Sequence, residues 1–299
     1  MVNIGSALEN TVPADAAAAT ALARSDAAAA ISSWPVAETL CPVVANDWVN
    51  DTYKHLILDA AHGAERAEPG QFFHFLCPTI GENAPFFRRP MSIYRIDRVQ
   101  GRLEFLYKIV GRGTTTLAAL APGGTLNIFG PLGRPFDFGT RYRHIVQVAR
   151  GVGLATLAPV AEAAGKLGVR TTAILSARSP QHLMSIEYLR SMGARVIAVT
   201  DTEGTSDIDA VEGILRGLIE KEGGDFLVTC GSNRLLQLLQ RLGREYGIAG
   251  EVALEQHMGC GIGMCFTCVR EFRTPEGGIT YRRVCWEGPV FDLQEAVSW

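Results

Sequence analysis

A chain of 299 residues, of which 47% are hydrophobic and 20% charged, carries enough apolar surface for two or three folded domains. Its formal net charge of −3 argues against nucleic-acid binding through a broad basic surface. No apolar run approaches the roughly 18 residues of a membrane span, so none is predicted.

Alanine sets the first 35 residues apart from the rest of the chain. Residues 14–30 are mostly alanine and offer no bulky apolar face to bury. We expect residues 1–35 to form a disordered extension, with a helix that docks on a partner as the alternative. Glu9, Asp15 and Asp26 interrupt any apolar stretch and the start lacks basic residues, which argues against a secretory signal and predicts a cytoplasmic protein.

Residues 36–138 have the pattern of a β domain. Short runs rich in β-branched and aromatic residues are separated by turn signals such as Glu68-Pro69-Gly70. The predicted strands are 36–44, 55–59, 71–76, 91–96 and 103–109. Short strands without long helices between them predict an antiparallel barrel or sandwich.

Residues 139–250 alternate between two patterns. Apolar runs predict strands at 144–149, 171–176, 195–200 and 225–229, and helical periodicity marks 154–167, 180–192, 207–222 and 233–246. This alternation predicts a doubly wound parallel sheet, where ligands bind at the carboxyl ends of the strands. A last strand, 251–255, leads into a cysteine-rich tail whose order we expect to depend on an inorganic centre.

Two segments of the β domain point to a flavin. Arg89 at a strand start can hold a diphosphate, with a surface ion pair as the alternative, and Ser92 can hydrogen-bond the polar edge of a flavin ring. Further on, a strand ends in a glycine turn that includes Gly113, and Thr114 opens a predicted helix over 115–120. The N–H groups at a helix start bind diphosphates. Ahead of a doubly wound domain, these segments predict a flavin cofactor.

Two glycine turns follow strands of the predicted parallel sheet. The first strand ends at Gly151-Val152-Gly153 and the fourth at Cys230-Gly231, which predicts a site for NAD or NADP. Arg150 either neutralises phosphate charge or blocks its approach. Cys230 either lies near a nicotinamide or fills the strand end. Asp201 either meets a ribose hydroxyl or caps the loop 202–206.

Four of the seven cysteines lie in the tail. Cys260, Cys265, Cys268 and, sixteen residues later, Cys285 have the C-x4-C-x2-C…C spacing of plant-type [2Fe-2S] ligation. The interleaved glycines let backbone N–H groups approach the cluster sulfurs. Three bunched cysteines disfavour zinc, which usually takes two short pairs, and the lack of a secretory signal disfavours disulfides. We therefore predict a [2Fe-2S] cluster, and expect Cys41 and Cys77 to be buried packing residues.

Together these motifs resemble the electron-transfer subunits of NAD-linked dihydroorotate dehydrogenase, within the ferredoxin-reductase-like flavoprotein superfamily. The resemblance covers roughly residues 36–299. It lies in Arg88-Arg89-Pro90-Met91-Ser92-Ile93, Tyr107–Thr114, Gly130-Pro131-Leu132-Gly133 and the tail from Met258 to Asp292. It implies an FAD-binding barrel over 36–138, an NAD(P)-binding domain over 139–250 and a [2Fe-2S] domain over 251–299.

The resemblance also implies roles for particular residues. The implied FAD-binding residues are Arg89, Pro90, Met91, Ser92, Tyr107 and Lys108, with Gly113 and Thr114 at the diphosphate. The implied cluster ligands are Cys260, Cys265, Cys268 and Cys285. The chain departs from the family pattern in two places, both at the nucleotide site. Ala149-Arg150-Gly151 stands where three glycines are usual, and Cys230-Gly231-Ser232 where Cys-Gly-Pro is usual.

The implied function is an electron relay without a catalytic acid or base of its own, because the cofactors carry the chemistry. Electrons pass between NAD(P), FAD, the cluster and an FMN-containing catalytic subunit, in a heterotetramer of pyrimidine biosynthesis. One alternative is the reductase component of another oxidoreductase, such as a ferredoxin–NADP transhydrogenase, a sulfide dehydrogenase or a catabolic system. Another is a redox-sensing subunit that does not turn over nucleotide.

Overall fold

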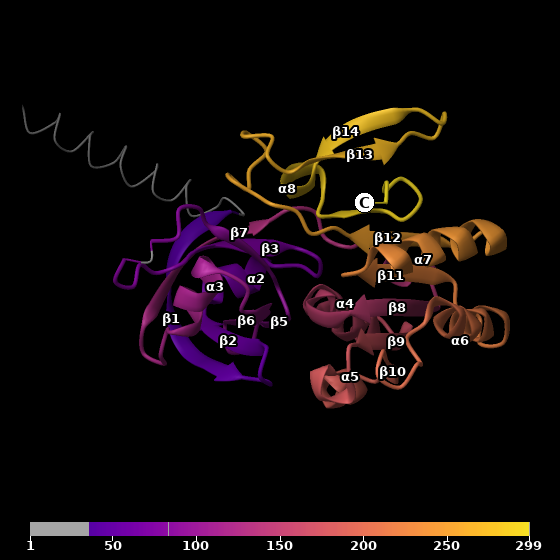
Figure 1. Ribbon diagram of the computed structural model, residues 1–299, viewed down its shortest axis with the longest axis horizontal. Helices are drawn as coiled ribbons and strands as arrows, with labels where there is room; N and C mark the ends of the chain where they lie inside the picture. Colours follow the sequence, from indigo (N-terminus) through magenta and orange to yellow (C-terminus); the bar gives the residue numbers. More distant parts are fainter. Residues whose placement is uncertain (1–35, 83, 299) are drawn as a thin grey trace, which may run out of the picture.

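A computed structural model describes residues 36–82 and 84–298 of the chain. Within these residues the chain forms a seven-stranded, a six-stranded and a two-stranded sheet (Figure 1). The predicted disordered extension, 1–35, lies outside the described residues. None of the described helices is long and apolar enough to cross a membrane.

The seven-stranded sheet is wholly antiparallel, with the strand order β4-β3-β7-β1-β2-β6-β5. Its strands are β1 (Ala37–Trp48), β2 (Tyr53–Asp59), β3 (Phe72–Leu76), β4 (Arg89–Ser92), β5 (Arg95–Asp97), β6 (Arg102–Lys108) and β7 (Thr125–Leu132). Two short helices accompany it, α2 (Ala61–Arg66) and α3 (Arg112–Ala118). Phe73, Phe75 and Phe105 are packed together in its core.

A corner at Ile93 and Tyr94 closes this sheet into a barrel. The sequence predicts one strand over 91–96, but the structure has two strands there, β4 and β5, at opposite edges of the sheet. The N–H of Ile93 donates to the Gln71 carbonyl (3.3 Å), next to β3, whereas the N–H of Tyr94 donates to the Glu104 carbonyl in β6 (2.8 Å). The chain thus changes partner strands between adjacent residues, which apolar periodicity does not record.

The six-stranded sheet has the order β10-β9-β8-β11-β12-β15 and is parallel except for β15. Its strands are β8 (His144–Arg150), β9 (Arg170–Ala177), β10 (Arg195–Thr200), β11 (Phe226–Cys230), β12 (Ala249–Ala253) and β15 (Val290–Asp292). The helices are α4 (Leu154–Lys166), α5 (Ile186–Ser191), α6 (Ile208–Glu220) and α7 (Asn233–Tyr246). Short 3₁₀ turns cover Gly139–Arg141, Gly151–Gly153 and Pro180–His182. Helices α4 and α5 pack in one core cluster and α6 and α7 in another, as a doubly wound sheet requires.

Two helices differ from their predicted extents. The helix predicted over 180–192 is split, because Ser185 adopts a left-handed conformation (φ 62°) between a 3₁₀ turn and α5. The helix predicted over 115–120, with Thr114 at its start, instead begins at Arg112 with Gly111 as its N-cap.

The tail forms a hairpin, β13 (Val269–Arg273) and β14 (Ile279–Arg283), then α8 (Val284–Glu287) and β15. Phe272, Val284 and Leu293 are fully buried in the core that α6 and α7 also share. The tail therefore gains order from packing on the parallel sheet as well as from any inorganic centre. The predicted division into segments 1–35, 36–138, 139–250 and 251–299 stays a proposal.

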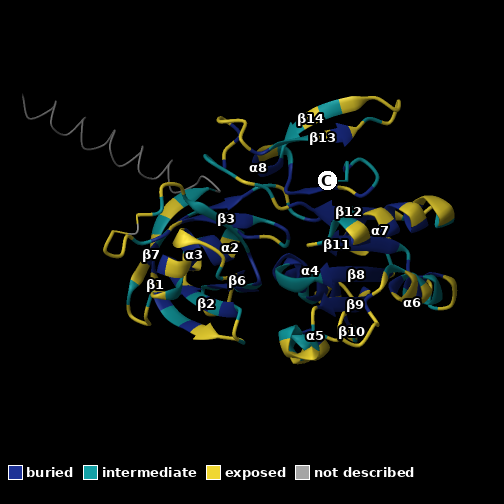
Figure 2. Cartoon of the chain, viewed as in Figure 1, coloured by how far each residue is buried: buried dark blue, intermediate teal, exposed yellow. Residues whose placement is uncertain are grey.

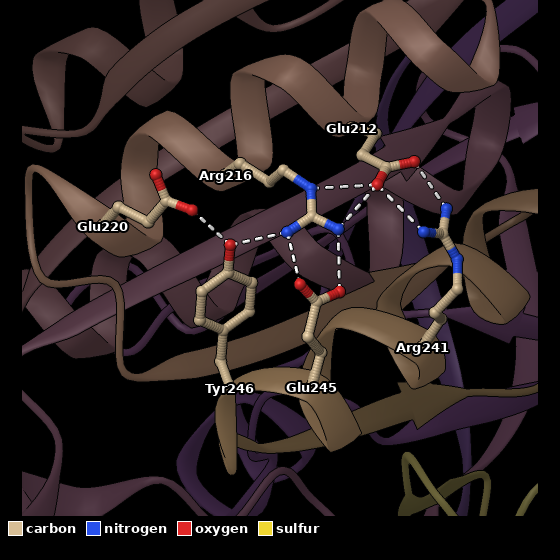
Figure 3. A network of polar contacts seen from close by, with 6 residues as sticks. All are labelled: Glu212, Arg216, Glu220, Arg241, Glu245 and Tyr246. Atoms are coloured by element: carbon tan, nitrogen blue, oxygen red, sulfur yellow. Dashed lines mark hydrogen bonds and ion pairs between the residues drawn. The ribbon is translucent and has the colours of Figure 1, made fainter.

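An ion-pair network joins α6 to α7 on their solvent side (Figure 3). The Arg216 guanidinium donates to both carboxylate oxygens of Glu245, at 2.6 and 2.7 Å, and to Glu212 at 3.0 Å. Arg241 also binds Glu212, and with Arg216 it holds the pKa of that carboxyl at about 2. The buried sides of the same helices are apolar, and Figure 2 shows the boundary between buried and exposed residues along them.

We expect the buried face of α7 to contribute more stability than this network. Leu239 is fully buried, so Leu239→Ala should lower the free energy of unfolding by about 2–5 kcal/mol through lost burial and a cavity. Arg216→Ala should cost less, and its cost should shrink as salt screens the exposed charges. Thermal unfolding of both variants at low and high salt measures this. An equal or larger loss for Arg216→Ala at high salt would contradict it.

Candidate functional site

A cavity of about 550 Å³ lies where the barrel, the parallel sheet and the tail meet. Seven of the eight residues predicted to bind FAD line it, namely Arg89, Pro90, Met91, Ser92, Tyr107, Lys108 and Thr114. The other walls are Phe72, Leu106, Val110, Val152, Ala155, Leu254–Met258 and Pro289. A largely apolar pocket with a few converging polar groups is the ordinary form of a cofactor site.

Gly113 is the eighth predicted residue, and it lies against Arg89. A Cβ built on Gly113 would lie 2.7 Å from Arg89 Nε and 3.0 Å from its Cζ. Only a residue without a side chain therefore lets the guanidinium occupy its place beside the start of α3. The two groups predicted to meet the diphosphate come from β4 and α3 and are brought together by the fold.

The Thr114 hydroxyl holds the turn that precedes α3. It accepts hydrogen bonds from the N–H groups of Val110 (2.9 Å) and Gly111 (3.2 Å) and donates to the Gly111 carbonyl (3.1 Å). The N–H groups of the first turn of a helix have no partner inside the helix. Thr114 thus fixes the backbone that presents these donors at the cavity wall.

Tyr107 positions α3 through its hydroxyl. The side chain is buried, and its hydroxyl donates to Asn46 Oδ1 (2.9 Å). The Asn46 amide in turn donates to the carbonyls of Leu117 (3.0 Å) and Leu120 (2.9 Å) at the end of the helix. Because this hydroxyl is engaged in the barrel, Tyr107 contributes to the cavity wall through its other atoms.

The two predicted nucleotide turns pack backbone against backbone. A Cβ on Gly153 would lie 2.5 Å from the Cys230 carbonyl oxygen, and one on Gly231 would lie 2.4 Å from the Arg150 carbonyl oxygen. Gly151 and Gly231 also have positive φ angles of 55° and 93°. None of the predicted nucleotide residues Gly151, Gly153, Cys230 and Gly231 lines the cavity, although their neighbour Val152 does. Their role toward a nucleotide stays a prediction.

The side chain of Arg150, the last residue of β8, is held by hydrogen bonds to other residues of the chain. Its guanidinium donates to both carboxylate oxygens of Asp201, at 3.1 and 2.7 Å, and to Ser176 Oγ at 2.8 Å. Hydrogen bonds from Arg150 and then Ser206 hold the pKa of Asp201 at about 2. Asp201 therefore has the loop-capping contact that was one of its two interpretations, and Arg150 bridges the ends of the first and third strands.

The remaining three cysteines are all buried. Cys41 and Cys77 are buried in the barrel core, as predicted. Cys230 is 1% exposed, and its thiol donates to Thr156 Oγ1 at 3.7 Å. Burial, reinforced by Glu255, raises the pKa of the Cys230 thiol.

The four tail cysteines form two pairs. The N–H of Cys260 donates to Cys265 Sγ and the N–H of Cys265 to Cys260 Sγ, both at 3.4 Å. The N–H of Cys285 donates to Cys268 Sγ at 3.4 Å. Within the described residues no group of three or more His, Cys, Asp or Glu side chains is placed to hold a single metal ion. Two pairs of thiols, rather than one group of four, fit a cluster of two irons with two thiolates on each.

The loop around these sulfurs supplies donors for negative charge. The N–H groups of Met264 (3.3 Å) and Ile262 (3.5 Å) point at Cys260 Sγ, and that of Gly263 points at Cys285 Sγ (3.2 Å). Hydrogen bonds from Thr267 and then Cys260 lower the pKa of the Cys265 thiol to about 6. The neighbouring Cys268 raises the pKa of the Cys285 thiol instead. The N–H groups directed at Cys260 and Cys285 stabilise negative charge on their sulfurs, so the residues fit the predicted cluster.

A short run of chain joins the cavity to this loop. Residues 254–258 line the cavity, and Cys260 follows two residues after Met258. Two residues span at most about 7 Å of extended chain. The strand predicted over 251–255 is observed as β12, Ala249–Ala253, and residues 254–258 were not predicted to line the site. Their position after a strand of the parallel sheet was a usable signal.

The tail and the full chain are similar to known proteins. A sequence model of the iron-sulfur cluster binding domain of dihydroorotate dehydrogenase B matches residues 255–297. A Desulforamulus reducens protein named dihydroorotate dehydrogenase B (NAD(+)), electron transfer subunit, is 32% identical over 83% of this chain and 93% of its own length. A Bacillus cereus protein of the same name is 33% identical over 81% of this chain and 92% of its own.

Solved structures share the fold. The structure of an NADH-dependent reduced ferredoxin-NADP oxidoreductase superposes with a TM-score of 0.72 at 24% identity, covering 86% of this chain and 89% of that one. Ferredoxin-NADP⁺ reductase from Plasmodium falciparum superposes with a TM-score of 0.56 at 14% identity, covering 72% of this chain and 96% of that one. The predicted fold class, a barrel followed by a doubly wound sheet and a cluster segment, is confirmed.

We expect the four tail cysteines, and not the other three, to hold iron. Cys268→Ala removes one thiolate of the buried pair and should abolish the iron–sulfur absorbance and the bound iron. Cys230→Ala is the matched control, because it removes an equally buried thiol outside the loop. Iron analysis and visible spectra of anaerobically purified protein test this. Retention of two irons per chain in Cys268→Ala would falsify the ligand assignment.

We also expect the contact between Gly113 and Arg89 to govern flavin retention. Gly113→Ala should displace the guanidinium and lower the flavin-to-protein ratio that survives gel filtration. Gly213→Ala serves as control, since a Cβ at that site in α6 meets no atom within 4 Å. Equal flavin content in both variants would count against a phosphate-binding role for Arg89.

Proposed function

The chain belongs to the family of dihydroorotate dehydrogenase B electron transfer subunits, and we propose that it relays electrons between a nicotinamide nucleotide, FAD and a [2Fe-2S] cluster. The observation that carries the proposal is the short covalent link between the flavin-type cavity and the cysteine loop. One end of residues 254–258 follows β12, and the other continues to Cys260. A relay needs its carriers close together, and this link keeps their two sites adjacent.

The proposed partner is an FMN-containing catalytic subunit that handles dihydroorotate in pyrimidine biosynthesis, within a hetero-oligomer. The names of the relatives support this, since they are electron transfer subunits of such an enzyme. The surface around the cysteine loop supports it too. Met264 is 74% exposed, Phe266 62% and Trp286 56%, and clustered exposed apolar side chains are typical of a surface that a partner covers.

The residues of this chain bind and orient rather than react. When bound, FAD converts the two-electron hydride of a nicotinamide into the single electrons that a [2Fe-2S] cluster carries. Ser92 faces the cavity as a hydrogen-bonding group, and Arg89 beside Gly113 offers a positive charge to a diphosphate. Phe72 and Pro289 add apolar surface to the cavity wall. The loop N–H groups stabilise negative charge on the cysteine sulfurs.

A second candidate function keeps the cofactors and changes the partner. It is the reductase component of another oxidoreductase, and the Arg150–Asp201 pair favours it because it departs from the family pattern at the nucleotide edge. The gene neighbourhood separates the two candidates, since the first requires an adjacent gene for a dihydroorotate-oxidising subunit. For either candidate we propose a cytoplasmic location. None of the seven cysteines forms a disulfide, which is typical of proteins in a reducing compartment.

The relay predicts a split phenotype. Protein purified anaerobically should hold one flavin and two irons per chain, and NADH or NADPH should bleach both. In Cys268→Ala the nucleotide should still bleach the flavin, while reduction of a co-purified catalytic subunit should fall by more than about tenfold, because the single-electron carrier is missing. Stopped-flow absorbance follows both steps. If neither NADH nor NADPH reduces the flavin, the proposed use of a nicotinamide nucleotide is wrong. If the purified protein contains no iron, the proposed [2Fe-2S] cluster is wrong.

A further inference from the structure

His74 lies on the face of the barrel sheet that the cysteine loop covers. Along β3 the side chains alternate, so that Phe73 and Phe75 enter the barrel core while Phe72 and His74 point to the opposite face. Phe72 on that face packs in the same core cluster as Cys268 and Cys285. His74 itself is fully buried.

The imidazole of His74 touches the loop beside a predicted cluster ligand. A Cβ built on Gly261 would lie 2.9 Å from Cε1, 3.0 Å from Nδ1 and 3.1 Å from Nε2 of the ring. Gly261 follows Cys260 directly and has a left-handed φ of 74°. Because these three distances are nearly equal, the loop closes over the face of the His74 ring, through a residue that has no side chain.

Both ring nitrogens of His74 lack a hydrogen-bond partner among the described residues. A buried polar group without a partner is costly and uncommon in folded proteins. His144 shows the usual solution, since it is equally buried and its nitrogens meet Thr172 Oγ1 (2.9 Å) and the Glu222 carbonyl (3.2 Å). The site of His74 is thus built for a polar group that the protein atoms do not supply.

The flavin cavity is not the source of that group. His74 is not among the residues that line the cavity, and Phe72, which does line it, lies alongside with ring centroids 5.6 Å apart. Arg88 is also nearby, but it donates to the His74 carbonyl oxygen and to Asn127, not to the ring. The loop that wraps the sulfurs lies against the ring at Gly261, directly beside Cys260.

We propose that a ring N–H of His74 donates a hydrogen bond to a sulfur of the [2Fe-2S] cluster, either a cysteine thiolate or a bridging sulfide. This inference rests on the proposed function, because it needs the cluster. Neutral imidazole carries one N–H and can donate it without a change of protonation. The reduced cluster has one more negative charge than the oxidised one, so the bond stabilises the reduced form more and raises its reduction potential. His74 is a positioning and tuning residue.

The reduction potential of the cluster tests the proposal. His74→Leu removes both nitrogens at similar volume, and we expect its reduction equilibrium to shift about tenfold toward the oxidised cluster, the worth of one hydrogen bond to a charged acceptor. For a one-electron couple, tenfold corresponds to about 59 mV. His74→Gln retains an N–H donor and should restore part of the shift. Redox titrations followed by electron paramagnetic resonance give these values.

His62→Leu is the matched control. His62 lies on α2, which packs on β6 and β7 of the barrel, and its Nε2 also lacks a partner among the described residues. Its replacement should leave the potential unchanged. An unchanged potential in an iron-loaded His74→Leu protein, or an equal shift in His62→Leu, would overturn the proposal.

A spectroscopic measurement keeps the proposal testable if His74→Leu fails to load iron. Protein grown with ¹⁵N-histidine should show a ¹⁵N coupling to the reduced cluster in pulsed electron paramagnetic resonance. The coupling should persist in His257→Gln, which removes the histidine of the tail, and vanish in His74→Gln. If iron-loaded protein shows no ¹⁵N coupling, the proposed hydrogen bond from His74 is wrong, while the proposed function is unaffected. If the protein does not hold two irons per chain, the proposed function itself is wrong.

Discussion

The chain runs directly from β12 into the cysteine loop, and this connection constrains how the loop, the parallel sheet and the barrel are placed. β12 lies deep in the parallel sheet, where a Cβ on Gly250 would approach the Leu227 carbonyl oxygen to 2.3 Å, so this strand cannot shift without moving its neighbour. The N–H of Leu254 then donates to the Pro289 carbonyl (2.9 Å), which ties the start of the cavity wall to the end of the tail. The loop position is consequently set by the parallel sheet, and the barrel has to fit against both.

The glycines of the two turns after β8 and β11 have two possible physical roles: they can leave space for a phosphate, and they let the two backbones pack together. A G-x-G turn after the first strand is commonly read as space for a phosphate. Here Gly153 and Gly231 are also required by direct backbone contact between two turns, whatever binds above them. The ion pair of Arg150 with Asp201 then spans the same edge. This edge of the sheet is thus held by backbone contacts and by an ion pair, so its glycines alone do not identify a nucleotide site.

Local patterns predicted the parts of the fold that depend on local physics. The apolar stripe of α7 gave its observed bounds, Asn233–Tyr246. The cysteine spacing predicted a grouping of four thiols, which the structure builds from three loop residues and Cys285 in α8. The barrel corner at Ile93 and Tyr94 was missed because it depends on partners in two distant strands. The strand β7 was not predicted, nor was the Arg150–Asp201 contact across 51 residues. His74 carries no local signal, because its importance arises only when the tail folds back over β3.

The paired cysteines also differ in their access to water, and this bears on the chemical durability of the protein. Cys268 and Cys285 are each 1% exposed, whereas Cys260 is half-buried and Cys265 open to solvent. Oxidation of cysteine follows thiolate character and exposure, so damage by oxidants begins at the outer pair and reaches the inner pair last. A protein surface seated on the loop closes that route. In the proposed assembly, the catalytic subunit that receives electrons at the loop would therefore also protect the cluster from oxidants between turnovers.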